Sequence, residues 1–163
     1  MIVDLDVNYS DRRWHRFDFI KYMKLLFKAD ILLSKIKTRE VAVSLLACNN
    51  NEIKELNYAF LGKNKSTNVL AWPTKHLATS YELVKSDNGF TKRAVLGDIA
   101  ISFDYCLKES KASKKSFDEH CCHLLVHAVL HLIGYNHETG NEASKMQKME
   151  NRILSNMGIC NIY

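Results

Sequence analysis

The chain has 163 residues, of which 47% are hydrophobic and 25% are charged, and its formal net charge is +5. This length is typical of one domain with its own hydrophobic core, so we expect residues 1–163 to form a single domain. The composition excludes a disordered or collagen-like chain, and the positive charge fits a polyanionic partner without singling out nucleic acid.

The first third of the chain predicts a strand, a helix and a second strand. Val3, Leu5 and Val7 alternate with polar residues, which is the pattern of a half-buried strand. Apolar residues recur at helical spacing over 14–35, so we expect one helix there. The run 40–47 is rich in β-branched and aliphatic residues and predicts the second strand.

The rest of the chain predicts two more strands among helices. In order, we expect a helix capped by Asn50, a strand at 69–73, a long excursion or hairpin arm at 74–93, a strand at 94–102 and helices at 103–111, 117–133 and 141–156. Strands mixed with helices along one chain predict an α/β (α+β) fold in which helices flank a small mixed β-sheet.

Three features predict a protein of the cytoplasm. No apolar run approaches the ~20 residues of a membrane-spanning helix, so we expect no membrane contact. The first ten residues have none of the basic and apolar pattern of a signal peptide. The five cysteines are odd in number, and the adjacent Cys121 and Cys122 fit no ordinary disulfide framework, so we expect free thiols in a reducing compartment.

The helix at 117–133 has clear boundaries and carries two histidines four residues apart. Ser116 followed by Glu119 has the spacing of a capping box, and Gly134 suits the turn that ends the helix. Two imidazoles at this spacing lie on one face of the helix and can reach a single ion. A long metal-binding helix is therefore expected.

His127, His131 and His137 together predict a metal site. His137 follows the Gly134 turn, which lets the chain bring it back over the end of the helix. Three nitrogen ligands leave a tetrahedral Zn²⁺ ion one open position, from which the ion polarises a phosphoryl or carbonyl oxygen or activates water. We predict one zinc ion per chain, with these histidines as metal ligands and catalytic residues.

Four other residues of this helix have less direct interpretations. His120 and His123 lie close to the line of the predicted ligands. They either support the metal site or wall its entrance, or they are partly buried histidines with backbone partners, and both interpretations stay open. Cys121 and Cys122 point away from that line, so we expect them to pack in the core.

Four segments, in order along the chain, resemble the motifs of the YbeY family, the bacterial zinc-dependent endoribonucleases of ribosomal RNA maturation. They are LNYAFLGKNKSTNVLAWP (56–73), LGDIAIS (96–102), HAVLHLIGYNH (127–137) and EASKMQKMENRIL (142–154). The resemblance implies zinc bound by three histidines in a basic groove and cleavage of single-stranded RNA. It also implies maturation of the 3′ end of small-subunit rRNA, ribosome quality control, and the small ribosomal subunit and the GTPase Era as partners.

The polar loop before the strand at 69–73 supplies the predicted substrate-binding residues. Lys63 and Lys65 are basic residues that can follow a phosphate backbone. Thr67 and Asn68 either contact RNA phosphate or cap a turn, as clusters of Ser, Thr and Asn commonly do.

The chain departs from the family's motifs at two positions that bear on catalysis. Leu61 stands where the motif carries Arg, and leucine can neither clamp a phosphate nor stabilise charge in a transition state. Asn136 replaces an Asp and removes a carboxylate beside the predicted site. An RNA-binding ribosome assembly factor that cleaves weakly or not at all is therefore the alternative to a metal-dependent endoribonuclease.

Two other zinc enzyme classes are disfavoured, and one acidic residue has an open role. A zincin protease needs Glu directly after its first ligand histidine, where this chain has Ala128, and the HxE and PCxxC motifs of zinc deaminases are absent from the sequence. Asp98, inside a predicted strand, either faces the metal groove or follows a bulge at Gly97 with its carboxylate in solvent.

Overall fold

The computed structural model describes residues 1–36, 38–74, 81–86 and 89–159. In chain order its elements are β1 (Ile2–Tyr9), the 3-10 helix η1 (Arg12–Arg16), α1 (Phe19–Leu26), α2 (Asp30–Ile36), β2 (Glu40–Cys48), α3 (Asn50–Leu61), β3 (Val69–Pro73), β4 (Tyr81–Ser86), β5 (Gly89–Ser102), α4 (Phe103–Ala112), α5 (Phe117–Leu132) and α6 (Gly140–Asn156). No helix within these described ranges is long and apolar enough to cross a membrane.

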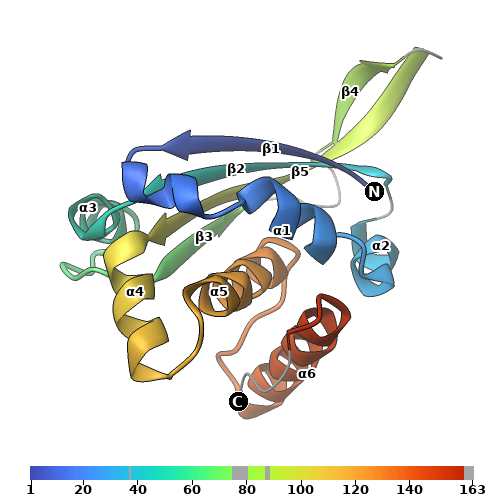
Figure 1. Ribbon diagram of the computed structural model, residues 1–163. Helices are drawn as coiled ribbons and strands as arrows, with labels where there is room; N and C mark the ends of the chain where they lie inside the picture. The colour runs from blue at the N-terminus through green and yellow to red at the C-terminus, as the bar shows by residue number, and fades with distance from the viewer. Residues whose placement is uncertain (37, 75–80, 87–88, 160–163) are drawn as a thin grey trace.

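The strands form one mixed sheet in the order β1-β2-β5-β3, and β4 pairs with the first part of β5. β1, β2 and β5 are parallel, whereas β3 and β4 run antiparallel to β5. Helices α1, α4, α5 and α6 lie on one side of the sheet, α3 lies at its end, and the β4–β5 hairpin projects from the body (Figure 1). The predicted α/β fold, with helices flanking a small mixed sheet, is confirmed.

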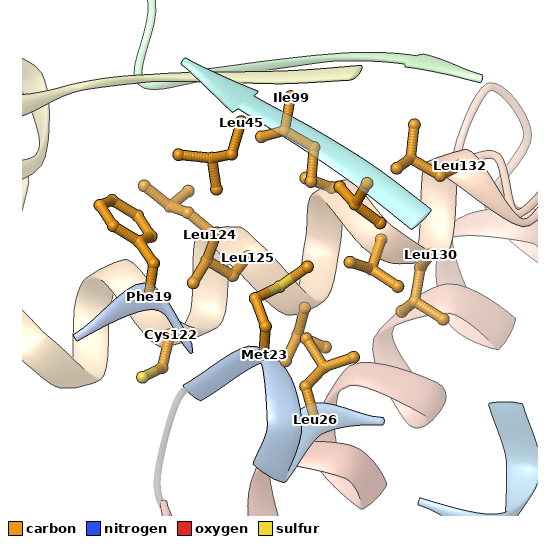
Figure 2. Close-up of a cluster of buried hydrophobic side chains, with 14 of the residues drawn as sticks. Phe19, Met23, Leu26, Leu45, Ile99, Cys122, Leu124, Leu125, Leu130 and Leu132 are labelled. Atoms are coloured by element: carbon orange, nitrogen blue, oxygen red, sulfur yellow. The ribbon is translucent and has the colours of Figure 1, made fainter. Parts of the chain in front are cut away.

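The hydrophobic core lies between the sheet and helices α1 and α5. Figure 2 shows side chains of α1, among them Met23, meeting Leu45 of β2, Ile99 of β5 and the leucines of α5. Cys121 and Cys122 are fully buried, as predicted. Full burial of one Leu, Met or Phe side chain contributes about 1.5–3 kcal/mol, so these contacts fix α5 firmly against the sheet.

Helix α5 leaves only one stripe of side chains in reach of solvent along most of its length. From residue 120 to residue 132, every residue is buried except His123, His127 and His131. Residues spaced by four lie one above the other on a helix. The packing of α5 therefore leaves these three histidines in a line on the one face of the helix that solvent can reach.

The single helix predicted over 14–35 is wrong, because the segment contains η1, α1 and α2. The Asp18 carboxylate accepts a hydrogen bond from the backbone N–H of Lys21 and starts a new helix, while Phe17 before it is extended. A side-chain acceptor at a helix start competes with continuation of the preceding helix. The apolar spacing suggests one continuous helix because Trp14 and Phe17, which lie before the start of α1, are buried like the apolar residues of α1.

The cap of α3 lies one residue earlier than predicted. The Asn49 side chain accepts from the backbone N–H of Glu52, and the Glu52 carboxylate accepts in return from that of Asn49, which completes a capping box. Asn50 is instead the first residue of the helix, and its Oδ1 accepts a hydrogen bond of 2.7 Å from Ser102 Oγ.

The segment predicted as an excursion or hairpin arm at 74–93 is a hairpin in its described part. β4 pairs with β5 from Tyr81 opposite Ala94 to Ser86 opposite Gly89, so β5 begins before the predicted strand at 94–102. Residues 75–80 and 87–88 of this segment lie outside the described residues.

A β-bulge decides on which side of the sheet Asp98 lies. The register between β2 and β5 shifts at Leu96, which is the extra residue. Gly97 has φ +134°, and a Cβ atom there would lie 2.1 Å from the carbonyl oxygen of Trp72, so only glycine fits. Asp98 is exposed and lines a separate groove with Trp72, so its placement toward the metal groove is wrong and the bulge is confirmed.

Candidate metal centre

His127, His131 and His137 converge at the C-terminal end of α5. Each offers one nitrogen atom, and these atoms all lie within 4.8 Å of one another. The ring centroids are 4.6 Å apart for the two helical histidines and 5.0 and 5.4 Å apart for the pairs with His137. The chain turns back at Gly134, whose φ is +90°, as the sequence predicts.

The tautomer of His131 follows from its hydrogen-bond partner. Its Nδ1 lies 3.0 Å from the carbonyl oxygen of Tyr135, which can only accept, so Nδ1 carries the hydrogen. Burial, followed by the nearby His127 and His137, lowers the pKa of His131 to about 4. The ring is therefore neutral at pH 7, and its Nε2 presents a lone pair.

His127 presents a second lone pair to the same point. Its Nδ1 lies 2.6 Å from Oε1 of Glu150, a carboxylate acceptor, which leaves Nε2 without a hydrogen when the ring is neutral. The Nε2 atoms of His127 and His131 are 3.1 Å apart. Two nitrogen ligands of a tetrahedral zinc ion, each about 2.0–2.1 Å from it, are about 3.3 Å apart. The donor set therefore fits a cation that relieves the repulsion between the two lone pairs.

Glu150 contacts the candidate metal centre, and no pattern singled out in the sequence points to it. Its side chain lies on α6, is almost fully buried, and contacts both His127 and, at 3.7 Å, Nε2 of His123. Its spacing in the sequence could have marked it, because Glu150 falls on the same buried face of α6 as Met146 and Ile153. A carboxylate on an apolar face needs a polar partner.

The two histidines left open by the sequence both have carboxylate partners. His123 contacts Glu150 and so supports His127 through it. Nε2 of His120 lies 3.0 Å from Oε2 of Glu109 on α4. Burial lowers the pKa of His120, and the hydrogen bond to Glu109 opposes this shift.

A groove of about 600 Å³ opens beside the three histidines. Besides the histidines, its lining includes Leu61 from the end of α3, Thr67 and Asn68 from the loop before β3, and Asn136. The groove therefore brings together the candidate metal centre, half of the predicted substrate-binding residues and both of the motif departures that bear on catalysis.

The four predicted substrate-binding residues separate into two pairs. Thr67 and Asn68 line the groove, whereas Lys63 and Lys65 are exposed on the preceding loop and are not part of the lining. Asn68 Oδ1 accepts a hydrogen bond of 2.7 Å from the backbone N–H of Val69, so this side chain contacts the backbone at the start of β3. Contact of the four residues with RNA stays a prediction.

The fold and the histidine group define an α/β protein with a candidate catalytic metal centre in an open groove. The family model described as Endoribonuclease YbeY matches residues 7–158 of the chain. The chain belongs to the YbeY family.

Curated relatives match over most of the chain. A protein of Ruegeria sp. (strain TM1040) named Endoribonuclease YbeY is 37% identical over 162 residues, covering 98% of this chain and 95% of that protein. One of Jannaschia sp. (strain CCS1) with the same name is 31% identical and covers 99% and 100%. A solution structure from Thermotoga maritima matches with a TM-score of 0.53 at 19% identity, over 94% of this chain and 91% of that one, which shows a shared fold.

Proposed function

We propose that the protein is a metal-dependent endoribonuclease that cleaves single-stranded RNA in ribosomal RNA maturation. The observation that carries the proposal is the pair of Nε2 atoms held 3.1 Å apart at the edge of an open groove, in a chain of the YbeY family. Membership in this family supports RNA as the substrate and hydrolysis as the reaction.

His127, His131 and His137 are the proposed metal ligands, and zinc is the ion that three imidazoles and an open position favour. When bound there, such an ion supplies Lewis-acid polarisation of a phosphoryl oxygen or a more acidic water molecule. The Glu150 carboxylate and the Tyr135 carbonyl keep the hydrogen of each helical imidazole on Nδ1, so that both Nε2 atoms face the groove.

The RNA is proposed to lie along the groove lined by Thr67 and Asn68, with Lys63 and Lys65 beside it to neutralise phosphates. We further propose that the 163 residues act as one cytoplasmic domain on the 3′ end of small-subunit rRNA and in ribosome quality control. The small ribosomal subunit and the GTPase Era are the proposed partners.

An RNA-binding assembly factor without strong nuclease activity is the second candidate. Leu61 is 52% exposed and lines the groove at the position where the family's motif carries Arg. An aliphatic side chain there offers no charge to a scissile phosphate.

Incubating labelled single-stranded RNA with the purified protein distinguishes the two candidate functions. We expect cleavage that a chelator abolishes and that added zinc restores, with metal analysis giving one ion per chain. Intact RNA bound by the metal-loaded protein would favour the assembly factor. Neither binding nor cleavage would overturn both candidates.

The Leu61→Arg variant is expected to cleave RNA about tenfold faster, because a guanidinium at this place can hold a phosphate and stabilise developing charge. Leu83→Arg is the matched control, since Leu83 is 70% exposed on β4 and outside the groove. Initial rates at saturating RNA make the comparison. Equal rates for Leu61→Arg and the native protein would show that the absence of this side chain does not limit cleavage.

A further inference from the structure

A second polar cluster, built from three elements, lies beside the groove and has no part in holding the metal. Oε2 of Glu109 on α4 lies 2.9 Å from Nδ2 of Asn68 in the loop before β3. The same oxygen lies 3.0 Å from Nε2 of His120 on α5. His120 is 8% exposed, so the cluster reaches from the core to the groove wall.

The hydrogen bonds of Asn68 fix which way its amide faces. Its Oδ1 accepts a hydrogen bond from the backbone N–H of Val69. Its backbone carbonyl oxygen accepts a hydrogen bond of 2.9 Å from the backbone N–H of Ser102. One of the two hydrogens on Nδ2 is directed to Glu109. The second takes part in no hydrogen bond within the described part of the chain, and Asn68 lines the groove.

His120 holds the other side of the Glu109 carboxylate. Its burial favours the neutral ring, which donates one N–H from Nε2 to Oε2 of Glu109. The carboxylate oxygen is therefore held between two donors, one from the core and one from the groove wall. Hydrogen bonds to a carboxylate are short and strong compared with neutral ones.

We propose that Glu109 is a positioning residue for RNA, which holds the Asn68 amide so that its remaining N–H donates to an acceptor oxygen of the bound RNA. This inference rests on the proposed endoribonuclease function, and it adds two residues, Glu109 and His120, that the RNA does not touch.

The sign of the expected effect separates positioning from simple electrostatics. A carboxylate close to a site for a polyanion repels it, so its removal alone strengthens RNA binding. If Glu109 positions Asn68, removal of the carboxylate instead weakens RNA binding, because the Asn68 amide has lost its anchor and must lose conformational freedom when RNA binds.

The test compares Glu109→Ala, Glu109→Gln and Glu55→Ala in the metal-loaded protein with labelled single-stranded RNA. Glu109→Ala is expected to raise KM and the RNA dissociation constant about tenfold, with kcat changed less than about threefold. Glu109→Gln keeps an acceptor oxygen and restores most of the affinity. Glu55 is exposed on α3 outside the groove, so Glu55→Ala is expected to bind RNA equally or more tightly.

A double-mutant cycle shows whether Glu109 acts through Asn68. In the Asn68→Ala background, Glu109→Ala is expected to cause no further loss of affinity. An equal loss in both backgrounds, or RNA binding by Glu109→Ala as tight as that of the native protein, would overturn the inference. If Glu109→Ala fails to fold, two other variants decide: Asn68→Ala must bind RNA more weakly than the native protein, and Glu109→Gln must bind it nearly as tightly. Asn68→Ala that binds RNA as tightly as the native protein would then overturn the inference. A native protein that neither binds nor cleaves RNA overturns the proposed function itself.

The metal content of every variant is measured as a control. Equal metal content in all variants excludes an effect through the metal centre.

Discussion

Replacing His131 with alanine is expected to abolish zinc binding and RNA cleavage together. The variant loses one of three converging nitrogen atoms and the lone pair that lies 3.1 Å from Nε2 of His127. Loss of a partner that only orients a ligand already costs roughly 10–100-fold in metal affinity, so loss of the ligand itself is expected to cost more than ~100-fold. Metal analysis after dialysis and cleavage of labelled single-stranded RNA measure the two effects.

His15→Ala is the matched control for this variant. His15 is exposed and stacks on Tyr9 with ring centroids 4.7 Å apart, away from the groove. It is expected to keep full metal content and full cleavage. The His131→Ala chain should still fold, because the native His131 ring is partly exposed and its loss removes one hydrogen bond, to Tyr135, worth about 1 kcal/mol. Cleavage retained by a folded, metal-free His131→Ala protein would contradict a role for the metal in the reaction.

The parts of the site that the sequence predicts correctly depend only on residues a few positions apart in the chain. The start of α5 follows from the Ser116 and Glu119 capping box, and the two helical histidines share a face because they are four residues apart. The return of His137 needs only the left-handed turn at Gly134. None of these features depends on how distant segments pack.

Two features could not be predicted from the sequence, because one depends on competition between a side-chain cap and helix continuation and the other on how distant strands pair. The break between η1 and α1 arises because the Asp18 side chain outcompetes continuation of a helix whose apolar spacing is otherwise regular. The side on which Asp98 lies depends on one extra residue, Leu96, and a shift of one residue moves a side chain to the opposite face of a strand. The sequence offers a bulge at Gly97 as one of two interpretations, and the alternation of side chains alone does not choose between them.

The Asn68, Glu109 and His120 cluster is a third case. Each residue belongs to a different element, and the hydrogen bonds span 41 and 11 positions of the chain. The sequence offers Asn68 as either a turn residue or an RNA contact, whereas in the structure its Oδ1 accepts from the backbone at the start of β3 and the residue also lines the groove. The two interpretations are therefore compatible.

Glu150 is the residue whose loss tests how the centre is organised. Glu150→Ala is expected to lower zinc affinity about 10–100-fold, because the Nδ1–H of His127 loses its acceptor and the ring is no longer fixed with Nε2 toward the groove. Competition with a chromophoric chelator measures the affinity, and nitrogen chemical shifts of the imidazoles report the tautomer of His127 without reference to activity.

Glu150→Gln separates orientation from charge. Its amide oxygen can still accept the hydrogen bond from Nδ1 of His127, although without the negative charge that makes the imidazole a stronger donor to metal. If orientation dominates, Glu150→Gln binds zinc nearly as tightly as the native protein, and Glu150→Ala alone is impaired. If charge dominates, both variants lose affinity alike while the tautomer of His127 changes only in Glu150→Ala. Native zinc affinity in Glu150→Ala would show that the contacts of His127 within α5 suffice to orient its ring.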